Sequence, residues 1–342
     1  MKAFARTWSR QPFWLYGIWA AALGLFILSI KSIPFQDLFT ALENLHPGSL
    51  LILAGLNLVI ILLLTSRWWL ILRAQGHPVN LIELAGFRLA AFSIAYFTPG
   101  PQFGGEPLQV HLLRSRQGVS SSNAIASVSL DRLLELIANF SFLAVGLFIL
   151  TQSGLLIALP SGQALIFTLG LLLIPIIYLV SLGRYKKPLS AVLKRIHHPK
   201  WLAAGVLVEE AEELIGAFCR QKPLTLLTTM FISLFTWIVM VGEYTLLLNF
   251  LGLAVSPAQA VIALTAARLA FIVPTPGGLG AFEASQVLAA GALGFSPLSG
   301  LAVSLVIRAR DLLFAAAGLW LSAHYLRRTP NYLRVTQSIE EE

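Results

Sequence analysis

Long apolar stretches separated by short polar segments dominate this chain. A membrane-spanning α-helix needs about 20 consecutive apolar residues, and six stretches come near that length. Four of them contain at most one charged residue, and the other two carry charges near their starts. The six predicted spanning helices are residues 13–30, 49–66, 123–150, 164–180, 224–250 and 300–325.

Two further apolar stretches are too short to cross a membrane, and both end in proline and glycine. Residues 84–97 precede Thr-Pro-Gly-Pro at 98–101, and residues 258–273 precede Pro-Thr-Pro-Gly-Gly at 274–278. Another short apolar stretch follows each break. Because proline and glycine end helices, the pattern predicts two pairs of half-helices. Irregular backbone is tolerated at membrane depth where it is buried in protein or lines a cavity, so we interpret each pair as a re-entrant hairpin.

The two breaks belong to an internal repeat. Arg-Leu-Ala precedes each break, beginning at Arg88 and at Arg268. Around the breaks, five residues recur in the same order and at the same spacing: Thr98, Pro99, Gly100, Glu106 and Gln109 in the first copy, and Thr275, Pro276, Gly277, Glu283 and Gln286 in the second. The chain is therefore predicted to be one membrane domain, residues 1–342, with repeats at about 49–150 and 224–325.

The distribution of Lys and Arg predicts opposite orientations for the two repeats. Basic residues before the first span and after the last place both termini in the cytoplasm. The loop at 184–222 holds eight Lys and Arg, and it is predicted to lie on the same side. The first hairpin then enters from the cytoplasm and the second from outside. An inverted repeat with broken helices places a polar site near the bilayer midplane.

Two polar regions are interpreted as structural. Residues 201–218 form an apolar stripe at helical spacing, with Glu209, Glu210, Glu212 and Glu213 on the other side. We expect a surface helix that faces basic loops and headgroups. At the end of the second span, we interpret Arg67, Trp68 and Trp69 as interfacial anchors.

Composition narrows the class of protein. Of 342 residues, 57% are hydrophobic and 12% are charged, with a mean hydropathy of +0.78. A soluble globule and a disordered chain are both excluded. The net charge of +8 is attributed to membrane orientation, and we expect no nucleic-acid partner. A single cysteine, with no metal-ligand spacing and no nucleotide loop, predicts neither a metal nor a cofactor.

Charged residues inside the apolar segments are the candidate site. Each costs about 2.5–3.5 kcal/mol near the centre of a membrane helix, so the set must pair or face water. Asp131 and Glu135 share a helical face, as do Arg308 and Asp311. The full set is Arg88, Glu106, Asp131, Arg132, Glu135, Glu243, Arg268, Glu283, Arg308, Arg310 and Asp311.

Two interpretations of these charges stay open. They can form an ion-pair network that only holds the bundle together. Alternatively, arginines beside two broken helices favour an anionic headgroup, because the guanidinium fork suits phosphate and helix N-termini supply N–H donors. The carboxylates could then balance the arginines, bind a cationic headgroup or carry protons.

Three motifs resemble the lysylphosphatidylglycerol synthase transmembrane (flippase-like) family, over roughly residues 10–328. They are Thr98-Pro-Gly with Gly105-Glu106, the Asp131-Arg132 turn, and Pro274-Thr-Pro-Gly-Gly-Leu-Gly280 with Glu283. The resemblance implies translocation functions for Glu106, Asp131, Arg132, Glu283, Pro276, Gly277, Gly278 and Gly280.

The resemblance also implies a function. In two-part synthases this membrane region is associated with moving aminoacylated phosphatidylglycerol between leaflets, while a separate cytoplasmic domain makes the lipid. Only residues 326–342 follow Tyr325, so we expect no synthase activity and no catalytic residue here.

The expected function is a lipid translocase of the cell membrane. Its partners would be membrane lipids with an anionic or phosphate-bearing headgroup, and a homo-oligomer is compatible with this interpretation. One alternative is an intramembrane transferase that acts on a lipid carrier. Another is an accessory scaffold for a lipid-modifying enzyme.

Overall fold

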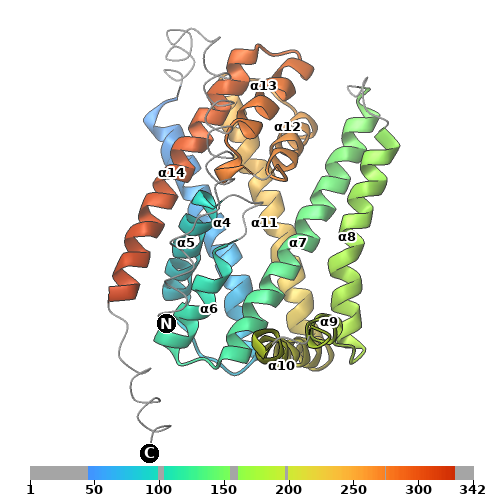
Figure 1. The fold of residues 1–342 in the computed structure, drawn as a ribbon. Helices are drawn as coiled ribbons and strands as arrows, with labels where there is room; N and C mark the ends of the chain where they lie inside the picture. Colours follow the sequence, from blue (N-terminus) through green and yellow to red (C-terminus); the bar gives the residue numbers. More distant parts are fainter. Residues whose placement is uncertain (1–44, 99–103, 155–160, 197–198, 274, 328–342) are drawn as a thin grey trace, which may run out of the picture.

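The computed structural model describes residues 45–98, 104–154, 161–196, 199–273 and 275–327. Within these ranges every regular element is a helix, so the all-α prediction is confirmed (Figure 1). The first predicted span, at 13–30, lies outside the described residues, as do Pro99 and Gly100.

Five long helices form the bundle. Four are long and apolar enough to cross a membrane: α4, α7, α8 and α11. The fifth, α14, extends over about 46 Å at 1.5 Å per residue, but it carries Arg308, Arg310 and Asp311. The bounds are α4 Pro47–Ala74, α7 Ser121–Gln152, α8 Ser161–Gly183, α11 Pro223–Phe250 and α14 Pro297–Arg327.

Two pairs of shorter helices flank the predicted breaks. The first pair is α5, Leu81–Phe97, and α6, Glu106–Gln117; the second is α12, Pro257–Ala270, and α13, Ala281–Ala292. A 3₁₀ turn, η1, Pro276–Gly278, follows α12. Gly277, Gly278 and Gly280 have φ of 55°, 68° and 77°, a region that glycine adopts without steric cost. The sequence of half-helix, break and half-helix is therefore present twice.

The two halves of the chain are interleaved. The initial long helices, α4 and α11, pack along each other. The final long helix of each half packs on the first short helix of the other half, α14 on α5 and α7 on α12. In Figure 1, α12 and α13 lie at the end of the bundle opposite α6, α9 and α10.

Close glycine contacts bring these crossing helices together. A Cβ added at Gly318 would overlap the carbonyl oxygen of Leu89, and one added at Gly146 would overlap the hydroxyl of Thr265. Each interleaved contact thus has a glycine on its long helix, which lets the backbones approach closely.

A short helix and an amphipathic helix cross one end of the bundle: α9, Pro188–Lys194, and α10, Pro199–Gln221. The apolar face of α10 packs with α7 and α8, as the stripe predicted. One part of that prediction is wrong, because Glu212 is only 2% exposed. Its carboxylate accepts hydrogen bonds from the backbone N–H groups of Leu189 and Ser190 at 2.9 and 3.0 Å, and from the Tyr178 hydroxyl at 2.9 Å. Glu212 therefore fixes the first turn of α9 onto α10.

Candidate functional site

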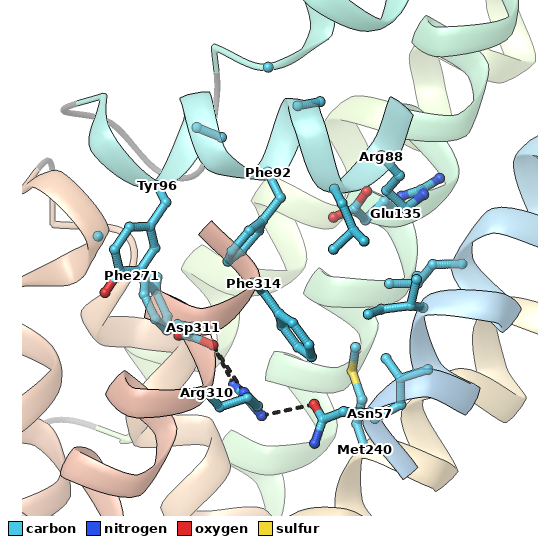
Figure 2. A pocket seen from close by; sticks show the side chains of 18 of the residues that line it. Asn57, Arg88, Phe92, Tyr96, Glu135, Met240, Phe271, Arg310, Asp311 and Phe314 are labelled. Carbon is cyan, nitrogen blue, oxygen red and sulfur yellow. Dashed lines mark hydrogen bonds and ion pairs between the residues drawn. The ribbon is translucent and has the colours of Figure 1, made fainter. Parts of the chain in front are cut away.

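A cavity of about 290 Å³ lies inside the bundle and is lined from both halves of the chain. Figure 2 shows Tyr96, Phe271 and Phe314 on one part of its wall, with Arg310 and Asp311 beside them. Eight charged side chains line it, four of each sign: Arg88, Arg132, Arg268, Arg310, Glu106, Asp131, Glu135 and Asp311. Eight of the eleven predicted charged residues therefore meet at one cavity, and Glu243, Glu283 and Arg308 are not part of its lining.

Asp131 is the centre of the first charged cluster. Its carboxylate lies 2.7 Å from Nε of Arg67 and 2.6 Å from Nη2 of Arg88. Arg67 is only 1% exposed and Trp68 is fully buried. Their interpretation as interfacial anchors is therefore wrong, because α4 continues to Ala74 and carries both side chains into the interior.

The matching glutamates of the two repeats have matching partners. Glu106, at the start of α6, lies 3.4 Å from Nε of Arg132, and its other oxygen accepts the N–H of Gly104 at 2.8 Å. Glu283, in the first turn of α13, lies 2.6 Å from Nε of Arg308, and its other oxygen accepts the N–H of Gly280 at 2.8 Å. Each glutamate thus links a glycine of the break to an arginine of the following long helix.

These two pairs differ in exposure. The Glu283 side chain is 0% exposed and that of Arg308 is 6% exposed, whereas the Glu106 side chain is 28% exposed. Arg308 also donates to the carbonyl of Gly277 and, at 3.5 Å, to the hydroxyl of Tyr96 from the first repeat. The second pair is therefore enclosed, while the first borders the cavity.

Arg310 is the centre of a third cluster. It donates to Asp311 at 2.9 Å, and its Nη1 lies 3.3 Å from the amide oxygen of Asn57 (Figure 2). The same Nη1 lies 3.3 Å from Glu243. Arg308 and Asp311, which share a helical face in the sequence, bind different partners. Asn57 also donates to Glu243 at 3.1 Å, so an uncharged residue of α4 completes this cluster.

Arg268 differs from the other arginines of the cavity. Within the described part of the chain, no carboxylate forms an ion pair with it. Its guanidinium lies 4.9 Å from the ring centre of Trp237, and Nη2 lies 3.6 Å from the sulfur of Met240. Phe142 also stacks on Trp237, with 4.0 Å between ring centres. The guanidinium is thus held by aromatic and sulfur contacts while it lines the cavity.

The other predicted residues have less direct relations to the cavity. Gln109 and Gly105 line it, and a Cβ at Gly105 would overlap the carbonyl of Ala91. Gln286 is buried away from it and accepts from the hydroxyl of Tyr244. Thr98 donates to the carbonyl of Ile94, and Thr275 is buried.

Three contributors are not among the site residues predicted from the sequence. Arg67 stands at the end of an uncharged run, Asn57 is an isolated amide within it, and Tyr96 precedes a break. The polar character of Asn57 and Arg67 inside one apolar helix was a usable signal. The contact of Tyr96 with the other repeat depends on tertiary packing, so the local sequence does not predict it.

Comparisons with known proteins identify a family of membrane proteins. The family model described as the lysylphosphatidylglycerol synthase TM region matches residues 14–318. A UPF0104 membrane protein of Methanocaldococcus jannaschii is 24% identical over 301 residues, 83% of this chain and 87% of that protein. One of Methanothermobacter thermautotrophicus is 25% identical over 307 residues, 85% and 88% of the two chains. No solved structure matches the chain.

Proposed function

Because this chain belongs to the family of the lysylphosphatidylglycerol synthase transmembrane region, we propose that it is a lipid translocase. It moves a phospholipid or a lipid-linked headgroup between leaflets by alternating access. The observation that carries this proposal is a cavity inside an apolar bundle, lined by four arginines and four carboxylates from both halves. Charged groups within membrane segments are costly and are typical of substrate pathways.

The volume of the cavity favours a headgroup as its occupant. Pockets for drug-sized ligands have volumes of about 300–1,000 Å³, and this cavity holds about 290 Å³. A small phosphate-bearing headgroup fits that space, and a whole lipid does not. The acyl chains would stay in the bilayer while the headgroup passes through the protein. The proposed substrate class is therefore a membrane lipid.

The interleaved halves support an inverted-topology repeat. In this proposal α4, α7, α8, α11 and α14 span the cell membrane together with residues 13–30, and both termini are cytoplasmic. The pairs α5–α6 and α12–α13 enter as re-entrant hairpins from opposite sides. Their location at opposite ends of the bundle (Figure 1) and their matching glutamate–arginine pairs favour this arrangement.

Reconstituted vesicles test the function. The protein is incorporated with headgroup-labelled phosphatidylglycerol, and headgroup accessibility from outside is followed over time. We expect faster transfer than in empty vesicles, and slower transfer by both Glu106→Gln and Glu283→Gln. Glu213→Gln is the matched control, because that side chain is 64% exposed on α10 and does not line the cavity.

Product analysis separates translocation from the enzyme alternative. A translocase leaves the mass of the lipid unchanged, and it needs both glutamates because each half is used in turn. A transferase would yield a lipid of new mass and would depend on one of them. Unaltered transfer by both glutamine variants would contradict the proposal, as would a new product.

A further inference from the structure

Arg88 and Arg268 are equivalent residues of the two halves. Each begins an Arg-Leu-Ala sequence in the short helix that precedes a break. Each guanidinium also lies over a tryptophan of the preceding long helix, at 5.8 Å for Arg88 over Trp68 and 4.9 Å for Arg268 over Trp237. Both arginines line the same cavity.

Their carboxylate partners differ. Arg88 is paired with Asp131 at 2.6 Å, and Asp131 immediately precedes Arg132, the partner of Glu106. In the second half the partner of Glu283 is Arg308, and the residue before it is Ile307. Ile307 also lines the cavity. Counted back by one residue from the arginine that pairs with the glutamate of each break, the second half therefore has an apolar residue where the first half has the carboxylate that neutralises Arg88.

No carboxylate of the described residues forms an ion pair with Arg268, and Glu135, Glu243 and Asp311 act on its charge only from beyond ion-pair distance. Arg310 brings a second positive charge to the same cavity, and it is already engaged by Asp311 and Glu243. Of the N–H groups of Arg268, the one hydrogen bond formed with the described residues is that to the sulfur of Met240. A guanidinium can donate five N–H groups in a planar fork, so most of the donors of Arg268 are not used by the described residues, and the side chain lines the cavity.

We propose that Arg268 binds the phosphate or phosphodiester group of the ligand, in the place that Asp131 occupies on Arg88. Guanidinium and phosphate oxygens form short, charge-assisted pairs of defined geometry. The attachment of that phosphate to a lipid rests on the proposed function. Binding of the anion itself rests on the difference between Asp131 and Ile307.

Substitution at Ile307 gives a test with a matched control. Ile307→Asp supplies the missing carboxylate, which should occupy Arg268 and exclude the ligand. Ile307→Asn introduces a polar group of nearly the same size without the charge. Arg268→Gln removes the cation, and Arg268→Lys keeps the charge but not the fork. All four are prepared as the full chain in dodecyl maltoside, a detergent without a phosphate group, and compared by thermal unfolding.

Calorimetric titration with dihexanoyl phosphatidylglycerol and, separately, with inorganic phosphate measures binding. We expect Arg268→Gln and Ile307→Asp to weaken binding at least tenfold. Ile307→Asn should stay within threefold of the unaltered chain, and Arg268→Lys should be intermediate. Binding of both probes indicates that the phosphate alone is recognised, whereas binding of the lipid alone indicates that its glycerol headgroup contributes.

The outcomes separate this inference from the proposed function. No binding by the unaltered chain, or equal binding by Arg268→Gln, overturns the inference. If Ile307→Asp does not fold, the binding measured for Arg268→Gln and Arg268→Lys tests the inference. Binding that depends on Arg268 without any lipid transfer in vesicles would support the inference and contradict the translocase. Lipid transfer that does not depend on Arg268 would support the translocase and contradict the inference.

Discussion

Arg67 and Glu243 occupy equivalent positions on α4 and α11 and carry opposite charges. Each lies 20 residues after the proline that begins its helix. Nη2 of Arg67 lies 3.6 Å from Glu135 on α7, and Oε1 of Glu243 lies 3.3 Å from Arg310 on α14. In each half, an ion pair therefore joins the first long helix to the last. The arginine is on the first long helix in one half and on the last long helix in the other.

Loss of Arg67 should strongly destabilise the protein. Arg67→Ala leaves Asp131 and Glu135 with one fewer cation in an enclosed space, and breaking a buried pair costs about 3–5 kcal/mol. We expect a large fall in the unfolding temperature in detergent. Adding Asp131→Asn should cost less than the sum of the two single changes. The exposed Arg184→Ala is the control and should leave unfolding unchanged, and strict additivity would mean that the pair is not coupled.

The partner of Arg308 can be identified by rescue. Arg308→Ala strands the buried carboxylate of Glu283, so the expected loss is again about 3–5 kcal/mol. Glu283→Gln in the same chain should restore part of the stability, since the remaining amide carries no charge. Asp311→Asn should not restore it, because Asp311 is paired with Arg310. The measurements are the temperature of thermal unfolding and the yield of folded protein. Rescue by Asp311→Asn alone would contradict the pairing of Arg308 with Glu283.

The glycine contacts predict where a single methyl group is harmful. Gly318→Ala forces apart α14 and α5 at the carbonyl of Leu89, and overpacking of this kind costs about 1–3 kcal/mol. Gly55→Ala, on α4, meets no atom within 4 Å and should be neutral or slightly stabilising. Thermal unfolding of the two variants tests this difference. Equal tolerance of both would show that the helices do not cross so closely.

Native Cys219 should react slowly with thiol reagents. Burial raises the pKa of its thiol to about 11, while neighbouring Arg220 opposes the shift in part. Since the thiolate is the reactive form, only ~0.1% of the chains carry it at pH 8. The rate of maleimide labelling should therefore rise about tenfold per pH unit up to pH 10. A rate at pH 7 equal to that of a free cysteine would refute the raised pKa.

Thiol labelling also tests the inverted topology. In a Cys219→Ser background, a cysteine at exposed Ser296 should react with an impermeant reagent from outside intact cells, and one at exposed Ser120 should not. Lys186→Cys provides a second cytoplasmic position, because Ser190 is buried and hydrogen-bonded to Glu212. Labelling of Ser120→Cys from outside would contradict the proposed arrangement. Permeabilised cells, in which all three positions should react, control for access.

The sequence predicted the parts of the fold that local chemistry determines. Proline and glycine placed both breaks, and apolar runs placed the long helices. The correspondence of Glu106 and Glu283, visible as a spacing, led to two pairs of like geometry.

The ion-pair partners and the burial of individual charged side chains could not be predicted in the same way. Arg308 lies three residues from Asp311 and nevertheless binds Glu283, which is 25 residues away. Arg67 looked interfacial because its run of apolar neighbours ends there, while its depth depends on how α4 packs with α7 and α11. Glu212 looked solvent-facing because its neighbours are acidic, and its burial depends on α9 folding back over it. Each error concerns a contact between segments that are distant in the chain.

The unequal enclosure of Glu283–Arg308 and Glu106–Arg132 bears on the energetics of a transport cycle. If the halves exchange environments, the pair that becomes enclosed gains the low-dielectric contact that the other pair gives up. The contact of Tyr96 with Arg308 would be released in the same step. The difference in free energy between the two conformations then depends on how unlike the halves are, and not on the strength of either ion pair. In the proposed translocase, the more alike the two halves are, the smaller this difference becomes.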